Sequence, residues 1–287
     1  MLKIRPECVP CTLFTGARMA KIASENLTLR RKVVSELARR FSEVTWDEVP
    51  LDLSYLAQEV VEDVTGVSDP YEEIKRRSNS IALKHYPDLE RRVAESPDPL
   101  EEAVRLSIAG NLIDFGPYAK VDFEQPFRKA SEEFAINDYE LFRRSVSASG
   151  SLLYFLDNAG EIVFDKLLIE TMIRVRGRPF DKVSLVVKEK PLINDATLED
   201  AEEVGLTGIP RAAIKFIGDG RGKAPSFRSS EVKSWIREHD LTIFKGQANF
   251  ETFEGLSGAF FLLVVKCEVV AEALGVGVGS LVLKHSG

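Results

Sequence analysis

The strongest constraint on the fold is a change of pattern near Ser149. After this residue, short apolar runs rich in Val, Ile and Phe alternate with segments of helical periodicity. The runs predict strands at 152–156, 183–187, 214–217, 242–244, 260–265 and 281–283. The intervening segments predict helices at 162–176, 198–204, 230–239 and 268–274. Such alternation implies right-handed crossovers and a mainly parallel sheet covered by helices on both faces, a three-layer α/β/α core.

The chain before Ser149 has a different pattern, because from about Thr12 its apolar positions recur at helical spacing, interrupted by prolines. We therefore expect an all-helical N-terminal region over residues 1–149 and an α/β/α core over residues 150–287. The length of 287 residues allows one or two domains.

Composition excludes several classes of protein. The net charge of −7 argues against a general nucleic-acid binder, which needs clustered Lys and Arg. The longest apolar run, 259–265, has the length of a strand and is far shorter than the roughly 20 residues of a membrane-spanning helix. The first residues lack the apolar stretch of a secretory signal. We therefore expect a cytoplasmic protein with no nucleic-acid or membrane partner.

The three cysteines are too few for a disulfide scaffold and suit a reducing compartment. Cys8 and Cys11 have a spacing that fits either a metal or a redox bridge, and Cys267 could supply a third thiolate. A structural zinc site needs four ligands, and the histidines show no metal spacing.

Polar residues follow the predicted strands, where ligands of open parallel sheets bind. Two Asp and one Asn, at Asp157, Asn158 and Asp195, offer the oxygen ligands that hard divalent cations prefer. Lysines after the later strands, Lys245 and Lys266, would neutralise phosphate charge, and nearby glycines would let backbone N–H groups approach phosphate oxygens. The combination predicts phosphate chemistry at a cation site.

Each of these features also has a purely local interpretation. Asn158-x-x-Glu161 and Thr197-x-x-Asp200 have the spacing of helix N-terminal caps, and Gly110-Asn111 that of a helix C-terminus. Lys245 could belong to a turn that ends a strand, and Lys266 could be a solvated charge. Neither a Gly-x-Ser-x-Gly nucleophile elbow nor a phosphate-binding Gly-x-x-x-x-Gly-Lys-Ser/Thr loop is present.

Taken together, the motifs resemble those of the domain-of-unknown-function-89 family, the damage-control phosphatases, and the cysteine pair is similar to its mainly prokaryotic branch. The matching segments span nearly the whole chain: Cys8-x-x-Cys11, 110–114, 157–161, 194–197, 245–251 and Lys266-Cys267. The segment 218–223 departs from the Ser/Gly-rich loop of relatives. The resemblance implies a helical N-terminal region joined to a Rossmann-like core.

The resemblance also implies a metal-dependent phosphatase acting on small metabolites such as sugar phosphates, phosphopantetheine derivatives or damaged nucleotides. The cation would be Mn²⁺ or Ni²⁺, with Co²⁺ or Mg²⁺ as alternatives, held by Asp157, Asn158 and Asp195. Asp157, Asp195 and Lys266 are the expected catalytic residues. The expected substrate-binding residues are Asn111, Glu161, Lys245 and Asn249.

The nucleophile would be a bound water or an aspartate, and the absence of an Asp-x-Asp-x-Thr pattern favours water. Two other functions remain open from sequence: a methyltransferase dependent on S-adenosylmethionine, and a non-catalytic metal or nucleotide sensor. A Gly-x-Gly turn after the first strand of the core, which the methyltransferase would favour, is missing. The sequence does not specify the oligomeric state.

Overall fold

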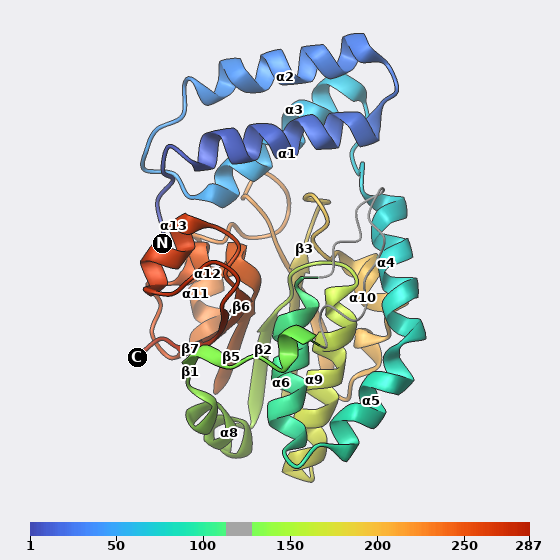
Figure 1. Ribbon diagram of the computed structural model, residues 1–287, viewed down its shortest axis with the longest axis vertical. Helices are drawn as coiled ribbons and strands as arrows, with labels where there is room; N and C mark the ends of the chain where they lie inside the picture. Colours follow the sequence, from blue (N-terminus) through green and yellow to red (C-terminus); the bar gives the residue numbers. More distant parts are fainter. Residues whose placement is uncertain (113–127) are drawn as a thin grey trace.

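The computed structural model describes residues 1–112 and 128–287 and has an α/β architecture with a helical N-terminal region (Figure 1). Ile113 and Asp114 of the 110–114 motif lie outside the described residues. No helix among the described residues is long and apolar enough to cross a membrane.

The sheet has seven described strands in the order β1-β7-β6-β5-β2-β3-β4. The five strands from β6 to β4 are mutually parallel, whereas β7 is antiparallel to β6 and β1 is parallel to β7. The strands are β1 (Phe134–Asn137), β2 (Ser151–Phe155), β3 (Lys182–Lys188), β4 (Ala212–Ile217), β5 (Leu241–Lys245), β6 (Ala259–Val264) and β7 (Leu281–His285). The mainly parallel sheet and all six predicted strands are confirmed.

Besides a 3₁₀ turn at Leu206–Gly208, two elements of the described residues were not predicted. The expectation of an all-helical segment up to Ser149 is wrong at β1, a four-residue edge strand whose residues alternate between half-buried and exposed. So short and partly exposed a run carries little signal of its own. The second is α12 (Gly246–Phe253), a buried helix that starts directly after β5.

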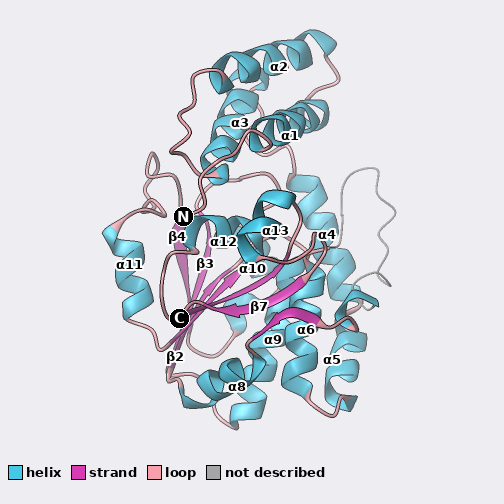
Figure 2. Cartoon of the chain, turned by 60° about the vertical axis from the view of Figure 1, so that its left-hand side comes forward, coloured by secondary structure: helices cyan, strands magenta, loops and turns pink. Residues whose placement is uncertain are grey.

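Helices cover both faces of the sheet (Figure 2). Side chains alternate along β2, so Leu152 and Tyr154 pack on one face and Leu153 and Phe155 on the other. The first face is covered by α4 (Glu72–Lys84), α5 (Tyr86–Glu95), α6 (Pro99–Gly110), α8 (Tyr139–Ala148), α9 (Glu161–Arg176) and α10 (Leu198–Glu203). The second face is covered by α11 (Ser230–Arg237), α12 and α13 (Glu268–Leu274).

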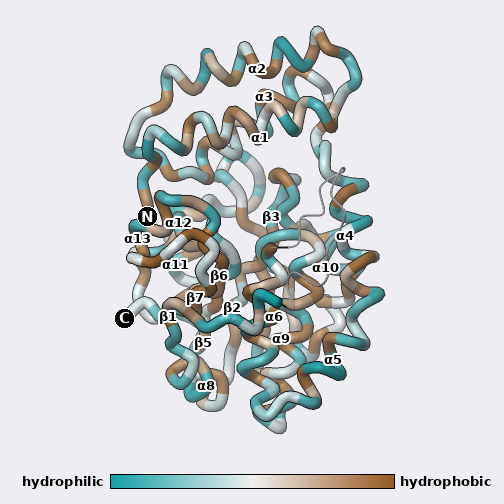
Figure 3. Tube along the Cα trace, viewed as in Figure 1, coloured by the Kyte–Doolittle hydropathy of each residue, from teal (hydrophilic) through white to brown (hydrophobic). Residues whose placement is uncertain are grey.

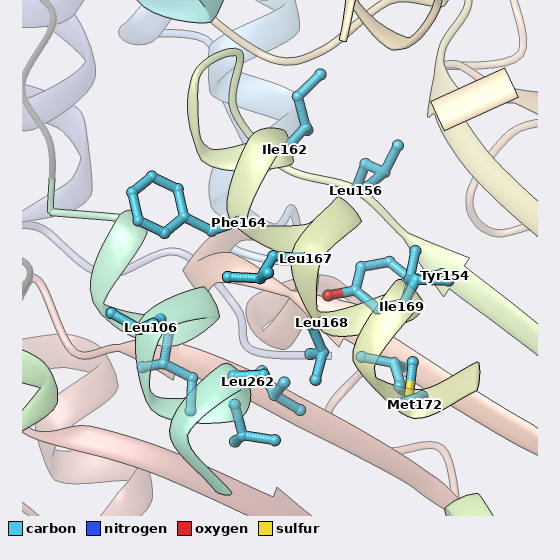
Figure 4. Close-up of a cluster of buried hydrophobic side chains, with 14 of the residues drawn as sticks. Leu106, Tyr154, Leu156, Ile162, Phe164, Leu167, Leu168, Ile169, Met172 and Leu262 are labelled. Carbon is cyan, nitrogen blue, oxygen red and sulfur yellow. The ribbon is translucent and has the colours of Figure 1, made fainter. Parts of the chain in front are cut away.

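The core of the first face is built around α9. Figure 4 shows α9 side chains, among them Phe164 and Leu167, beside Leu106 of α6 and Tyr154 of β2. Because α9 is mostly buried from Glu161 to Met172, its first turns fix the loop that precedes it, and that loop carries Asp157 and Asn158.

The first three helices form a separate layer with its own core, centred on residues such as Met19, Leu37 and Leu53. These helices are α1 (Cys8–Ala23), α2 (Leu27–Phe41) and α3 (Pro50–Thr65), and Figure 3 shows apolar and polar positions alternating along them. The Leu2 N–H donates to the Glu251 carbonyl (2.7 Å) and so attaches the start of the chain to α12, while the Ile4 N–H donates to the Glu48 carbonyl (2.9 Å) just before α3. We call these three helices the cap.

Candidate functional site

The loops after β2 and β3 are joined at the carboxyl edge of the sheet. The Ala196 N–H donates to the Asp157 carbonyl (2.8 Å), and the Ala159 N–H donates to the Asn194 carbonyl (2.9 Å). Asn158 and Asp195 form an isolated antiparallel bridge. The structure thus places the three predicted cation ligands side by side, and the carboxylates of Asp157 and Asp195 are buried, with 7% and 8% exposure.

The Asp157 carboxylate lies where three segments meet. The side-chain amides of Asn111, at the end of α6, and Asn158 each donate to its Oδ2 at 2.8 Å. Both amides also donate to Oε2 of Glu161, the Asn158 bond being 3.0 Å long. Gly246, at the start of α12, approaches from the other side, and a Cβ atom there would lie 1.8 Å from Asp157 Oδ2. This close approach requires glycine.

Below Asp157 lies a fully buried ion cluster. The Lys245 ammonium donates to Glu161 Oε1 (2.8 Å), to Asp165 Oδ1 (2.6 Å) and to the Ser107 carbonyl (2.9 Å). Asp165 Oδ1 also accepts bonds from Ser107 Oγ (2.8 Å) and Tyr154 OH (3.0 Å). All three donors of Lys245 therefore have partners inside the protein, and its charge stabilises the ionised form of Glu161.

Burial and neighbouring charges shift the pKa values of the carboxylates at this edge. Burial, followed by the charges of Glu161 and Asp195, raises the pKa of Asp157 well above its ordinary value. Burial also raises the pKa of Asp195. Burial opposes ionisation of Glu161 as well, but the charges of Lys245 and then Lys266 leave its pKa lowered. A cation between these groups would relieve the repulsion and favour the ionised carboxylates.

Two lysines lie near the carboxylates. Lys188, the last residue of β3, is buried and its Nζ lies 3.5 Å from Asp195 Oδ2. Lys266 is exposed, its backbone N–H donates to Gln247 Oε1 (2.8 Å), and its charge acts on both Asp157 and Glu161. Our set of candidate site residues did not include Lys188, although its place at the end of a parallel strand was a usable signal.

The donor set fits a hard divalent cation. In the described parts of the chain, no group of three or more His, Cys, Asp and Glu side chains could hold a metal ion by itself. The predicted set has two carboxylates and one amide, and cations such as Mg²⁺ commonly complete such a set with water and phosphate oxygens. One further observation supports the fit: the buried Oδ1 of Asn111, beside Asp157, has no hydrogen-bond partner.

Three of these motifs could also have been helix caps, and the structure gives a different answer for each. The capping box at Asn158 and Glu161 is wrong, because Gly160 is the N-cap of α9 and the Asn158 amide bonds to carboxylates instead. The cap of α10 is confirmed, since Asp200 Oδ2 accepts bonds from both N–H and Oγ1 of Thr197 at 3.0 Å. Asn111 is the C-cap of α6, but its side chain also reaches Asp157.

Asn249 of α12 has internal partners. Its side-chain amide donates to the Leu156 carbonyl (3.2 Å) and the Lys245 carbonyl (2.7 Å). The residue therefore ties the ends of β2 and β5 together and aligns Gly246 with Asp157. The three cysteines are free thiols, and burial raises the pKa of both Cys8 and Cys11.

A cavity of about 400 Å³ lies between the cap and the edge of the sheet. Tyr55 and Gln58 of α3 line it from the cap, and Glu189, Asp219 and Arg221 from the loops after β3 and β4. Neither Asp157 nor Asp195 lines this cavity, but Lys190 and Pro191, which do line it, belong to the loop that carries Asp195.

Comparisons with known proteins identify a family and agree with the fold. Residues 4–282 match the damage-control phosphatase ARMT1-like domain. A protein from Archaeoglobus fulgidus named damage-control phosphatase is 34% identical over 296 residues, covering 99% of each chain. A similarly named protein from Pyrococcus horikoshii is 31% identical over 292 residues, covering 98% of this chain and 97% of its own. A crystal structure of a domain-of-unknown-function-89 protein from Pyrococcus horikoshii, 29% identical, covers 100% of both chains with a TM-score of 0.86.

Proposed function

Because this chain belongs to the damage-control phosphatase family, we propose that it hydrolyses phosphate monoesters of small metabolites with a divalent cation held by Asp157, Asn158 and Asp195. Mn²⁺ and Ni²⁺ are the cations we favour, followed by Co²⁺ and Mg²⁺. Sugar phosphates, phosphopantetheine derivatives and damaged nucleotides are the substrate classes to examine first.

The observation that carries the proposal is the pair of buried carboxylates, Asp157 and Asp195, on two loops that bond to each other through their backbones. Two buried acids that repel one another are unfavourable unless a cation or a proton compensates them. A bound divalent cation would supply this compensation and polarise a phosphate oxygen of the substrate.

Side chains of the protein would orient the carboxylates and neutralise phosphate charge during the reaction. The Asn111 and Asn158 amides orient Asp157 and Glu161 through the bonds described above. Lys266, exposed at the edge, is the cation available to neutralise charge on the transferring phosphoryl group. We propose water as the nucleophile, since both amide donors hold Asp157 Oδ2 in place as an acceptor.

Lys245 and Asn249 take positioning roles in this proposal. Lys245 is completely buried, and its ammonium is held by Glu161, Asp165 and the Ser107 carbonyl. Direct contact with substrate would require breaking at least one of these bonds, which is costly in a buried site. We therefore propose that Lys245 acts on the reaction through Glu161.

The leaving group would occupy the cavity beneath the cap. The cavity is lined in part by the loop that carries Asp195, and its lining includes an aromatic ring, an amide and several charged side chains. A polar, hydroxylated leaving group could form hydrogen bonds with this lining. The cap would thereby select among phosphate esters.

The test is release of inorganic phosphate by chelator-treated protein resupplied separately with Mn²⁺, Ni²⁺, Co²⁺ or Mg²⁺. A panel of sugar phosphates, nucleotides and phosphopantetheine would rank the leaving groups. We expect activity that depends on added metal and is abolished in Asp157→Ala. Glu254→Ala, at an exposed glutamate of α12's end, is the control that should retain activity. Folded protein with no turnover under any metal would contradict the proposal.

A further inference from the structure

A buried asparagine far away in the sequence bonds to the Asp157 loop. Asn79 of α4 is fully buried, and its Oδ1 accepts a bond from the Gly160 N–H at 2.7 Å. Its Nδ2 donates to Asp200 Oδ1 and to Glu203 Oε2, both at 2.9 Å. The two acidic acceptors define which end of the amide faces Gly160.

Asp200 links Asn79 to the loop after β3, which carries Asp195. Its Oδ2 accepts bonds from the N–H and Oγ1 of Thr197, which lies two residues after Asp195. The same carboxylate lies 3.2 Å from the ammonium of Lys75, which in turn lies 2.9 Å from Asp69. Lys75 is itself buried, with 4% exposure, so its charge compensates Asp200 in a poorly solvated setting.

We propose that Asn79, Asp200 and Lys75 form a positioning network that fixes both cation-bearing loops relative to α4. The inference rests on the proposed cation site at Asp157, Asn158 and Asp195. None of the three network residues touches the site, and the network acts through the Gly160 amide on one loop and through Thr197 on the other.

The network can act on the site because each residue that it bonds lies close along the chain to a proposed cation ligand. Two residues separate Gly160 from Asp157, and one residue separates Thr197 from Asp195. Because these segments are so short, a displacement of Gly160 or Thr197 also displaces the ligand. Groups that orient metal ligands from behind commonly change metal affinity about 10- to 100-fold when removed.

The experiment measures Mn²⁺ binding to metal-free Asn79→Ala by calorimetry and hydrogen exchange of the segment 157–161 by mass spectrometry. We expect a Kd raised about 10- to 100-fold and faster exchange in that segment even without metal. At saturating Mn²⁺, kcat should recover more fully than at low Mn²⁺, since the variant retains all the ligands.

Asn26→Ala is the matched control. Asn26 Oδ1 likewise accepts backbone N–H groups, from Thr28 (2.9 Å) and Leu29 (3.4 Å), but at the start of α2 in the cap. Its loss should lower stability by about 1 kcal/mol and leave the Kd for Mn²⁺ unchanged. Thr197→Val is the milder second variant should Asn79→Ala fail to fold. It removes one bond to Asp200, and we expect a Kd about fivefold higher.

The outcomes separate this inference from the cation site itself. Wild-type protein that binds no Mn²⁺ would refute the cation site, and hydrogen exchange of 157–161 would still test the network. A Kd in Asn79→Ala or Thr197→Val within twofold of wild type, or unchanged exchange in both variants, would overturn the positioning role.

Discussion

Gly246 shows how a single backbone position can control the site. It has a positive φ of 77°, and any Cβ atom there would collide with the Asp157 carboxylate. The approach is so close because Gly246 directly follows β5, the strand that pairs with β2. The conformation and the contact therefore both exclude larger residues.

Gly246→Ala should displace Asp157 and lower metal-dependent phosphate release about 100-fold, the size of effect that misplacement by about 1 Å produces. Gly275→Ala is the matched control, because Gly275 also has a positive φ, of 69°, yet nothing lies within 4 Å of its Cβ position. The control should lose about 1–2 kcal/mol of stability from backbone strain and keep full activity. Equal activity losses in the two variants would contradict this explanation.

Glu251 of α12 makes stability depend on pH. Burial, opposed by a hydrogen bond from Gln247, raises the pKa of Glu251 from 4.5 to about 7. Between these values the folded protein holds a proton that the unfolded chain releases, so the free energy of unfolding falls as pH rises through this window. Below about pH 4.5 both states are protonated, and the penalty is absent.

Glu251→Gln removes this titration. Between pH 5 and pH 8, its free energy of unfolding should fall by up to about 3 kcal/mol less than that of the wild type. Urea unfolding at both pH values measures the difference. Glu254→Gln, an exposed neighbour, should keep the wild-type pH dependence. If Glu251→Gln also kept the wild-type dependence, Glu251 would not be the titrating group.

Among single residues, the sequence predicted the site residues that follow strands. It missed the residues whose role depends on partners far away in the chain. That Asp157, Asn158 and Asp195 come together was predictable, because the carboxyl ends of parallel strands meet at one edge. Asn79 and Asp165 were not, since their bonds to Gly160 and Lys245 span 81 and 80 positions and follow from packing alone.

Among the elements, the contact between α6 and α9 fixes Asn111. Gly110, the last residue of α6, packs so closely on α9 that a Cβ atom would lie 2.9 Å from Cγ of Phe164. Because the Phe164 ring is itself fully buried, it has little room to move. The next residue is Asn111, whose amide bonds to Asp157 and Glu161.

Gly110→Ala should therefore push the end of α6 away from α9, lower stability by about 1–3 kcal/mol and reduce activity by displacing Asn111. Gly208→Ala is the control, because nothing lies within 4 Å of that Cβ position and its φ is not positive. Urea unfolding and phosphate release measure both effects. Full activity in Gly110→Ala would show that the site does not depend on this contact.

The order of elements in the core was largely predictable, whereas β1 and α12 were not. The β1 strand is identified by pairing with β7, which comes about 145 residues later in the chain and is visible only after folding. The α12 segment starts with Gly and contains Asn, Thr and two Phe, residues of weak helical propensity, and it is stabilised by burial against α3 and β6.

At the scale of the whole molecule, the main feature is the contact between the cap and the carboxyl edge of the sheet. Arg228 of the loop before α11 pairs with Asp52 of α3, and Arg221 pairs with Glu59 of α3. Both pairs join α3 to the segment after β4, and Arg221 and Glu59 also line the cavity that we propose for the leaving group. The sequence indicated two regions but not which helix would cover the site.

Tyr55→Ala should raise KM about tenfold, or about 1.4 kcal/mol, for the best substrate of the panel, while kcat changes less. The reason is that Tyr55 lines the cavity next to the loop that carries Asp195, without belonging to the proposed cation site. Trp46→Ala, at an exposed aromatic residue in the loop between α2 and α3 and outside the cavity, is the control. A KM unchanged by Tyr55→Ala would place the leaving group elsewhere.

The central claim is that Asp157 and Asp195 hold the cation on which hydrolysis depends. Its most direct test is a Mn²⁺ titration of phosphate release by metal-free wild-type protein and Asp195→Asn. We predict that activity of the wild type rises from the baseline and saturates, and that Asp195→Asn needs far more Mn²⁺ or stays inactive. Full activity of Asp195→Asn at the same Mn²⁺ concentrations, or of the wild type without metal, would contradict the claim.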